Sequence, residues 1–437
     1  PDALAAMIAG ELPSEPAARV RVFIETFGAR AFRRPLTAVE TDRYAALFER
    51  GAGHYGGPDP FVDGVRITIE AMLQSPHFVY RVEAGPGTEA DPSRLTGYEV
   101  AARLSYLLWN TMPDAELFAA AASGQLGSVE GITAQAERMF DDPRTRATFD
   151  HFHLQLFEMH EYADIDKDTG VFPEWRREMG AMMLTEMQMF LSSVVFTRQG
   201  TVGDLFTATH TYVNQDLAPL YGLEGEFSGE FTEVELDPST RAGFLTRLGF
   251  LTRNATLTEP DPIHRGVFAN LNVICRPLAA LPNIPDNLMP VGNTNRERID
   301  SITGDGTCGA GCHSTTINPL GFALENYDAI GRYRTEDNGY PVDAAALYVF
   351  EDGRAIDFRN GIELSYMLAD SPEVHSCYIG SLLEYALSRS VAIADGALVT
   401  RLTEESLARG TSIREVFMSV VTSNVFRNRA PTTRADP

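Results

Sequence analysis

The sequence is short of cysteine and of positive charge. Only four of its 437 residues are cysteine, and 36 Lys and Arg residues stand against 60 Asp and Glu residues, which gives a formal net charge of −24. This balance excludes nucleic acid as a partner, because such binding needs a basic surface that displaces phosphate counterions. It also disfavours an anionic membrane surface.

The sequence also lacks long apolar runs. No stretch of 18 or more consecutive apolar residues occurs, and the longest apolar stretch, 182–196, is interrupted by Thr185, Glu186 and Gln188. We therefore expect no membrane span. Phosphate-binding loops, dinucleotide fingerprints and nucleophile elbows are missing as well. With 44% hydrophobic and 10% aromatic residues the chain can form packed cores, and its length favours more than one.

The residue pattern predicts a mainly α protein. Apolar residues recur at helical spacing through the N-terminal third. Two pairs have the spacing of helix-capping boxes, Thr37 with Glu40 and Thr96 with Glu99. Residues 244–256 are interpreted as short strands, and residues 340–358 as a small β hairpin that turns at Gly353.

The sharpest motif is Cys308-Gly-Ala-Gly-Cys312-His313. A covalent c-type haem needs two thiols that add across the porphyrin vinyl groups and an adjacent histidine that binds the iron. The usual spacing puts two residues between the cysteines, whereas three stand here, and a Gly-Ala-Gly insert is flexible enough to absorb the extra one. The same residues allow two alternatives: a local Cys308–Cys312 disulfide with His313 incidental, or a zinc site with a fourth ligand.

Residues around the motif are candidates for supporting a haem. The carbonyl of Pro319 could accept the second N–H of the His313 imidazole, which would fix the tautomer of the ligand. Arg332 could pair with a haem propionate, with a surface salt bridge as the alternative. The sixth iron ligand is not readable from the sequence, and the candidates are Met367, Met289, His264, His153 and His375.

The motif and the segment after it resemble the planctomycete-type cytochrome c family. The segment is Ile317-Asn-Pro-Leu-Gly-Phe-Ala-Leu-Glu-Asn-Tyr-Asp-Ala-Ile-Gly-Arg-Tyr-Arg334. Further stretches similar to that family lie at 31–37, 74–78, 103–109, 262–266, 384–389 and 423–427. The resemblance implies a large exported protein, built from several domains of unknown function, with redox work at its haem and no established substrate.

We therefore expect a helical bundle in the N-terminal part and a c-type-cytochrome-like C-terminal part with the small hairpin. The expected domains are an N-terminal helical domain at 1–90, a helical bundle at 91–222, a haem-bearing domain at 223–358 and a C-terminal helical domain at 359–437. The expected function is electron transfer or extracellular oxidation through one covalent haem c. We expect the protein in the periplasm, on the outer surface or outside the cell.

The expected partner is a redox protein or an extracellular substrate, and the acidity of the chain suits steering toward a basic partner. Two rival functions remain open. One is a haem peroxidase or oxygenase. The other is a binding or assembly protein without redox work, in which Cys308–Cys312 is a structural disulfide.

Once the motif uses two cysteines, Cys275 and Cys377 remain, and an exported protein rarely leaves both thiols free. Both lie near expected helix ends. We predict a disulfide between them that closes a loop of about 100 residues around the motif. The alternative is a pair of separately buried thiols.

Overall fold

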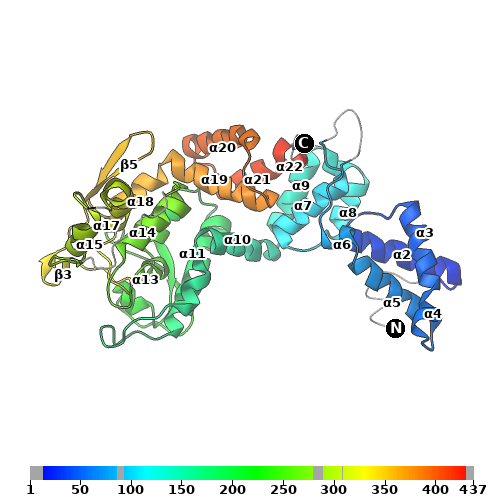
Figure 1. The fold of residues 1–437 in the computed structure, drawn as a ribbon, viewed down its shortest axis with the longest axis horizontal. Helices are drawn as coiled ribbons and strands as arrows, with labels where there is room; N and C mark the ends of the chain where they lie inside the picture. Colours follow the sequence, from blue (N-terminus) through cyan, green and yellow to red (C-terminus); the bar gives the residue numbers. More distant parts are fainter. Residues whose placement is uncertain (1–12, 86–92, 279–288, 308, 430–437) are drawn as a thin grey trace. The chain divides into compact units, whose positions relative to one another are not determined.

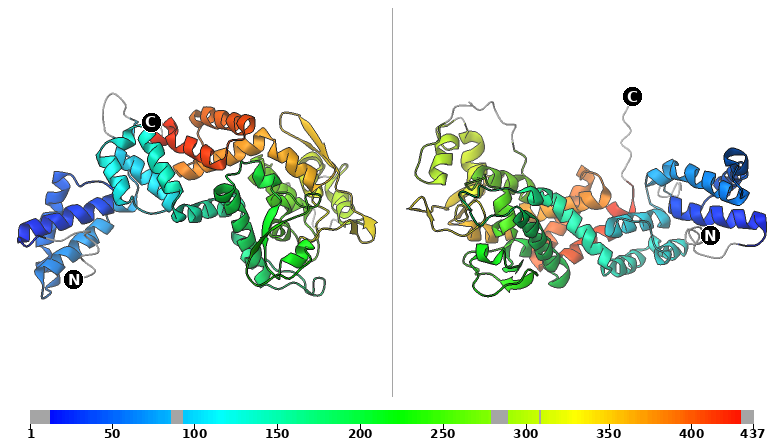
Figure 2. Two further views of the ribbon diagram at one scale, coloured as in Figure 1. Left: turned by 180° about the vertical axis from the view of Figure 1, so that it is seen from behind. Right: turned by 90° about the horizontal axis from the view of Figure 1, so that it is seen from below.

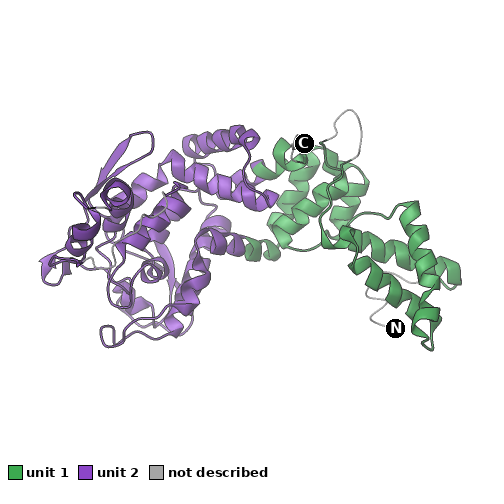
Figure 3. Cartoon of the chain, in the orientation of Figure 1, with its two compact units in different colours: residues 1–148, 420–437 green, residues 149–419 purple. Residues whose placement is uncertain are grey.

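The computed structural model describes residues 13–85, 93–278, 289–307 and 309–429 (Figure 1). The chain forms two compact units, which Figure 3 colours separately. Unit 1 is Pro1–Thr148 with Val420–Pro437, and unit 2 is Phe149–Ser419. Helices dominate both units, and the strands of the described residues pair only in three two-stranded antiparallel sheets. The expected mainly α fold is thus confirmed.

The first part of unit 1 is a small helical cluster. Its helices are α2 (Pro16–Phe32), α3 (Ala38–Glu49), α4 (Gly51–Tyr55), α5 (Pro60–Leu73) and α6 (Pro76–Val79). Phe23, Phe48 and Met72 meet in its core. The Thr37 side chain accepts from the Glu40 N–H while the Glu40 carboxylate accepts from the Thr37 N–H, so this capping box is confirmed and starts α3.

The second part of unit 1 joins the middle of the sequence to its C-terminal end. Its helices are α7 (Gly97–Trp109), α8 (Ala115–Ala122), η1 (Gln125–Gly127), α9 (Val129–Phe140), the first part of α10 (Pro143–Leu156), the last part of α21 (Ile413–Thr422), and α22 (Asn424–Arg427). The expected capping box at the start of α7 is present. Arg94 forms an antiparallel bridge with Asn428, and the Arg103 guanidinium donates to the carbonyl of Asn428 at 3.1 Å.

Unit 2 begins with helices around one small sheet. They are η2 (Met159–Asp164), α11 (Glu178–Ser192), the π-helical turn η3 (Ser193–Thr197), α12 (Asp204–Thr207), η4 (Ala218–Tyr221), η5 (Phe244–Thr246), α13 (Leu248–Arg253), α14 (Pro262–Phe268) and the π-helical turn η6 (Ala269–Val273). Strand β1 (His210–Val213) pairs with β2 (Thr232–Glu235).

The helix from Glu178 to Thr197 is the one described segment long and apolar enough to cross a membrane by length and composition. More than half of it is buried within the protein. Its residues Met183, Met187 and Phe190 lie in the core, and the carboxyl of Glu186 on the same helix is also buried. We interpret it as a core helix.

The expectation of strands at 244–256 is wrong. That segment forms η5 and α13, and the hydroxyl of Thr246 accepts from the Ala242 N–H at 2.8 Å. Arg247 is fully buried there and donates to the carbonyls of Ala208 and His210, both at 2.8 Å. An apolar run of this length fits a buried strand or a buried helix equally well, so tertiary contacts decided between them.

The remainder of unit 2 carries the motif and the other two sheets. Its helices are α15 (Asn295–Thr303), α16 (Ala310–Cys312), the π-helical turn η7 (His313–Ile317), α17 (Asn318–Phe322), α18 (Gly361–Ala369), α19 (Pro372–Leu387), η8 (Ile393–Asp395), α20 (Gly396–Arg409) and the first part of α21. Strand β3 (Glu336–Asp337) pairs with β4 (Tyr340–Pro341), and β5 (Ala346–Val349) pairs with β6 (Ala355–Phe358). The predicted hairpin that turns at Gly353 is therefore confirmed.

Cys275 and Cys377 form a disulfide, with their Cα atoms 5.3 Å apart. The predicted pairing is thus confirmed. The bond joins the segment after η6 to α19, which lies beside α20 in both views of Figure 2. The motif stands within the loop that this bond closes, a loop with a sequence separation of 102 residues.

Candidate functional site

The candidate haem motif lies where α16 meets the π-helical turn η7. Cys308 lies outside the described residues. Cys312 ends α16, is partly exposed and carries a free thiol. His313 follows directly, and only 6% of it is exposed. The two neighbours therefore present a free, partly exposed thiol and a buried imidazole side by side.

The imidazole of His313 is held through one of its two nitrogens. His313 Nδ1 lies 3.1 Å from Oδ1 of Asn318. Among the described residues, Nε2 has no hydrogen-bond partner. The expected partner, the carbonyl of Pro319, instead accepts from the Ala323 N–H within the helical turn. The prediction for Pro319 is corrected: the amide side chain of the preceding residue supports the ring.

The π-helical geometry explains why Asn318 reaches His313. At 100° per residue, a side chain five positions along an α-helix points about 140° away from the first. In η7 the Asn318 N–H instead donates to the His313 carbonyl, which is the i to i+5 bond of a π turn. This wider turn brings the two side chains onto one side.

The motif is fixed to α14 by two glycines. A methyl group added to Gly266 in α14 would lie 2.0 Å from the carbonyl oxygen of Ile317, and one added to Gly321 in α17 would lie 1.8 Å from the carbonyl oxygen of Pro262. Glycine is the residue that allows such a backbone approach. The helix after His313 therefore rests on α14 with no side chain between them.

Arg265 locks the same crossing from the inside. It is fully buried, and its guanidinium donates to five carbonyl oxygens at 2.8–3.3 Å. These carbonyls belong to Asn254, Leu324, Tyr327, Leu251 and Asp328. Burial lowers the pKa of Arg265 to about 10. The side chain ties the segment after α17 to α13 and α14.

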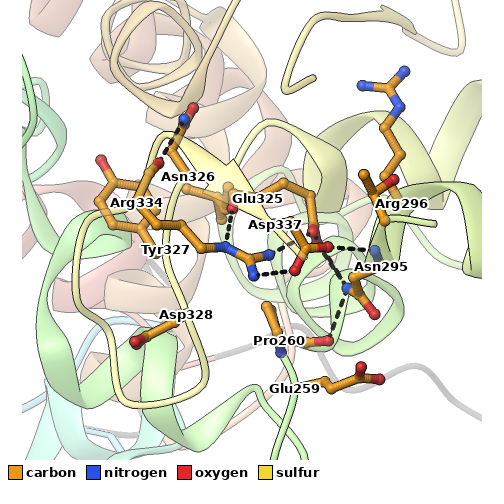
Figure 4. Close-up of polar contacts among 12 residues, drawn as sticks. Glu259, Pro260, Asn295, Arg296, Glu325, Asn326, Tyr327, Asp328, Arg334 and Asp337 are labelled. Atoms are coloured by element: carbon orange, nitrogen blue, oxygen red, sulfur yellow. Dashed lines mark hydrogen bonds and ion pairs between the residues drawn. The ribbon is translucent and has the colours of Figure 1, made fainter. Parts of the chain in front are cut away.

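A second buried polar cluster, shown in Figure 4, holds the start of α15. Asn295 donates to Glu325 Oε1 at 3.1 Å and to the Pro260 carbonyl at 3.1 Å. Arg334 lies between two carboxylates, 3.1 Å from Glu325 Oε2 and 2.7 Å from Asp337 Oδ1. Burial raises the pKa of the Glu325 carboxyl, and the charge of Arg265 and of Arg334 opposes that shift.

Four family models match the chain, and each is described as a protein of unknown function. They are DUF1595 at residues 19–83, DUF1592 at 95–223, DUF1588 at 241–337 and DUF1585 at 355–426. These are the domains of one group of proteins, and together they span most of the chain.

The chain belongs to the planctomycete-type cytochrome c family.

Within this family member, the DUF1588 match at 241–337 contains the motif, Arg265 and the cluster of Figure 4. Neither the curated proteins nor the solved structures give a significant match to the chain.

The donor set at the motif fits a haem iron. A neutral imidazole whose Nδ1 donates a hydrogen bond offers the lone pair of Nε2 to a metal, and an adjacent free thiol can form a thioether. No group of three His, Cys, Asp or Glu side chains forms a metal site among the residues that the structure describes.

Arg332 lies apart from these contacts. Its guanidinium bonds Asp328 at 2.7 Å and also contacts the carboxylate of Glu174. These ion pairs are the surface salt bridge that the sequence left as the alternative to a propionate contact.

Three of the five candidate sixth ligands are engaged with other groups. His375 Nδ1 lies 2.8 Å from the Ser406 hydroxyl and its Nε2 lies 2.8 Å from the Ala369 carbonyl. His153 is buried, and its Nε2 contacts the Tyr378 hydroxyl at 2.9 Å.

His264 is exposed, and its Nδ1 contacts Asp261 at 2.6 Å, which raises the pKa of the imidazole. Pro262 and Gly266 face α17, so His264, two residues from each, points away from the motif. Met289 is 82% exposed and Met367 is 36% exposed.

Sequence reasoning missed Asn318, Thr303 and Arg265. Asn318 stands five residues after His313, a spacing that no α-helical rule marks. The hydroxyl of Thr303 accepts from the Asn318 side chain at 2.9 Å, across a separation of 15 residues. The only signal for Arg265 was its place in a stretch similar to the family, at 262–266.

Proposed function

We propose that this protein is an exported c-type haem protein that transfers electrons outside the cytoplasm, with one haem held by Cys308, Cys312 and His313. The observation that carries the proposal is the buried His313, fixed through Nδ1 with Nε2 unbonded among the described residues, beside the free thiol of Cys312. A haem bound there would supply one-electron redox chemistry.

The chain's own residues would orient the imidazole that binds that group. Asn318 holds the ring plane of His313. The glycine contacts between α14 and α17 keep the helix that follows His313 in place. Only 6% of His313 is exposed, so its ring is packed among protein groups. The residues thus present an imidazole whose orientation is fixed.

Two further observations support export and a charged partner. The disulfide Cys275–Cys377 is typical of proteins outside the cytoplasm. The net charge of −24 favours a basic redox partner, which long-range attraction would steer toward the chain. Electron exchange with such a partner is expected to slow as ionic strength rises.

A haem enzyme is the second candidate, and one observation favours it. Both ring nitrogens of His375 bond other groups, Nε2 of His153 bonds the Tyr378 hydroxyl, and His264 lies on the side of α14 away from α17. Neither His375 nor His264 therefore supplies a ligand to the second face of an iron at His313. An open sixth position would allow peroxide or oxygen chemistry.

The test is to measure haem in the full chain produced together with the machinery that attaches haem. We expect one haem per chain that survives acid-acetone extraction, by pyridine haemochrome and intact mass. His313→Gln should abolish the native iron ligation, whereas His160→Gln, at an exposed histidine, should leave the spectrum unchanged.

Two outcomes of these measurements decide between the possibilities. A protein without haem, in which Cys308 and Cys312 are two hydrogens lighter, would overturn the proposal in favour of a structural disulfide. If haem is present, a sharp reduced α band without binding of added ligands indicates electron transfer, and a high-spin spectrum indicates the enzyme.

A further inference from the structure

A chain of hydrogen bonds runs from the backbone of α15 to the imidazole of His313. Thr303 Oγ1 lies 2.7 Å from the Ile299 carbonyl oxygen, Asn318 Nδ2 lies 2.9 Å from Thr303 Oγ1, and Asn318 Oδ1 lies 3.1 Å from His313 Nδ1. Thr303, Asn318 and His313 are all buried, so water does not compete for these bonds.

The direction of every bond in this chain follows from its first member. A carbonyl oxygen can only accept, so the hydroxyl hydrogen of Thr303 points to Ile299, and the lone pairs of Oγ1 remain to accept. The Asn318 group that faces Thr303 must then be the NH₂. Its oxygen consequently faces His313, and an oxygen can only accept from Nδ1–H.

We infer that Thr303 and Asn318 form a positioning relay that fixes His313 as the Nδ1–H tautomer and keeps the lone pair of Nε2 free. The relay concerns the imidazole itself, and its effect on a haem iron rests on the proposed function. The opposite tautomer would leave Nδ1 as an acceptor and would need the Asn318 NH₂ to face it. That flipped amide would place its oxygen against the lone pairs of Thr303 Oγ1, so the relay also disfavours the opposite tautomer.

The relay is tied to the packing of the motif. A methyl group added to Gly309 would lie 3.2 Å from the Cα atom of Thr303 and 3.5 Å from Cδ2 of His313, so the residue after Cys308 packs between them. At its other end α15 starts at Asn295, which the Glu325 carboxylate holds. The two ends of α15 are therefore both fixed, and Thr303 stays in register with Asn318.

The first experiment measures the tautomer directly in the full chain made without haem attachment. The ¹⁵N chemical shifts of the histidine nitrogens distinguish Nδ1–H from Nε2–H, and the His313 signal is assigned by its loss in His313→Gln. We expect Nδ1–H in the wild type. In Thr303→Val, which loses the acceptor but keeps the shape, the ratio of Nδ1–H to Nε2–H should fall about tenfold, the effect of one hydrogen bond.

Two variants separate this role from a structural one. Thr303→Ser keeps the hydroxyl and should restore the wild-type ratio. Thr185→Val removes a hydroxyl that bonds the carbonyl four residues back at 3.0 Å but touches no histidine, and it should leave the ratio unchanged. Nε2–H in the wild type would overturn the relay, and that result does not depend on how Thr303→Val folds.

The second experiment measures the reduction potential of the haem-loaded chain. An acceptor on Nδ1–H makes the imidazole a stronger donor to iron. In Thr303→Val the Asn318 amide loses the bond that keeps its oxygen toward His313, so Nδ1–H is bonded less and the potential should rise, with Thr303→Ser at the wild-type value. An unchanged potential in Thr303→Val would overturn the relay. A chain that shows Nδ1–H but attaches no haem would leave the relay standing and refute the proposed function instead.

Discussion

The closest backbone approach near the motif makes a quantitative prediction for Gly321→Ala. The added methyl group would lie 1.8 Å from the Pro262 carbonyl oxygen and 2.5 Å from its carbon. Ordinary carbon–oxygen contacts are about 3.3–3.6 Å, so α14 and α17 must separate by roughly 1.5 Å. Both groups belong to backbones, so no flexible side chain can swing away.

The expected free-energy change is the difference of two effects. Forcing an extra methyl group into a packed contact costs about 1–3 kcal/mol. Alanine in place of glycine in a helix contributes about 0.5–1 kcal/mol in the stabilising direction. Because both clashing groups are backbone, the upper part of the first range applies, about 2–3 kcal/mol. We therefore expect Gly321→Ala to lower the free energy of unfolding of unit 2 by about 1–2.5 kcal/mol.

Gly380→Ala is the matched control, because nothing lies within 4 Å of a methyl group added there in α19. It should stabilise unit 2 by about 0.4–1 kcal/mol.

Urea unfolding measured by tryptophan fluorescence provides the assay. The chain has two tryptophans, both buried, with Trp109 in unit 1 and Trp175 in unit 2. In a Trp109→Phe background, Trp175 alone reports the unfolding of unit 2. If Gly321→Ala is as stable as its parent, or if Gly380→Ala lowers the free energy of unfolding by as much as Gly321→Ala does, then α14 and α17 do not approach this closely.

Three other predictions concern unit 2. Replacing Cys275 and Cys377 together by serine should lower the free energy of unfolding of unit 2 by up to about 4–5 kcal/mol, measured by urea unfolding. Free thiols at both positions of the wild type, found by non-reducing peptide mapping, would contradict the disulfide. Arg334→Ala should lower the free energy of unfolding by about 3–5 kcal/mol, because it leaves buried carboxylates unpaired. Arg332→Ala, at a half-exposed ion pair, should lower it by less than about 1 kcal/mol. Equal decreases for the two variants would refute this distinction. Burial lowers the pKa of His153 to about 3 from 6.5, so the contribution of the neutral ring to the free energy of unfolding is complete above pH 6.5 and is lost as the pH falls. Between pH 7 and pH 4 the free energy of unfolding of the wild type should fall by about 3 kcal/mol more than that of His153→Gln. Equal decreases would show that His153 titrates normally.

Features that depend on neighbouring residues could be predicted from the sequence. The capping box of Thr37 and Glu40 needs only residues three positions apart. The hairpin at Gly353 needs only a turn residue between alternating strands, and Gly353 has the positive φ of 84° that such a turn uses. The pairing of Cys275 with Cys377 followed from counting, because only two cysteines remained.

The candidate site could be predicted only in part. The sequence located Cys312 and His313 as neighbours, and the four matching domains confirmed the family. It assigned the support of the ring to the Pro319 carbonyl, but that carbonyl is used within α17. The partner is Asn318 because η7 is a π turn, and a π turn depends on how the helix packs.

What the sequence by itself determined is therefore the helical class, the caps, the hairpin, the disulfide and the position of the motif. Each rests on the chemistry of residues close along the chain, or on the small number of cysteines. The tertiary structure alone decided that residues 244–256 are helical, that Arg265 meets five carbonyls and that Thr303 reaches Asn318. A buried polar group bonds whichever acceptor its surroundings leave unpaired, and those surroundings come from segments far apart in the sequence.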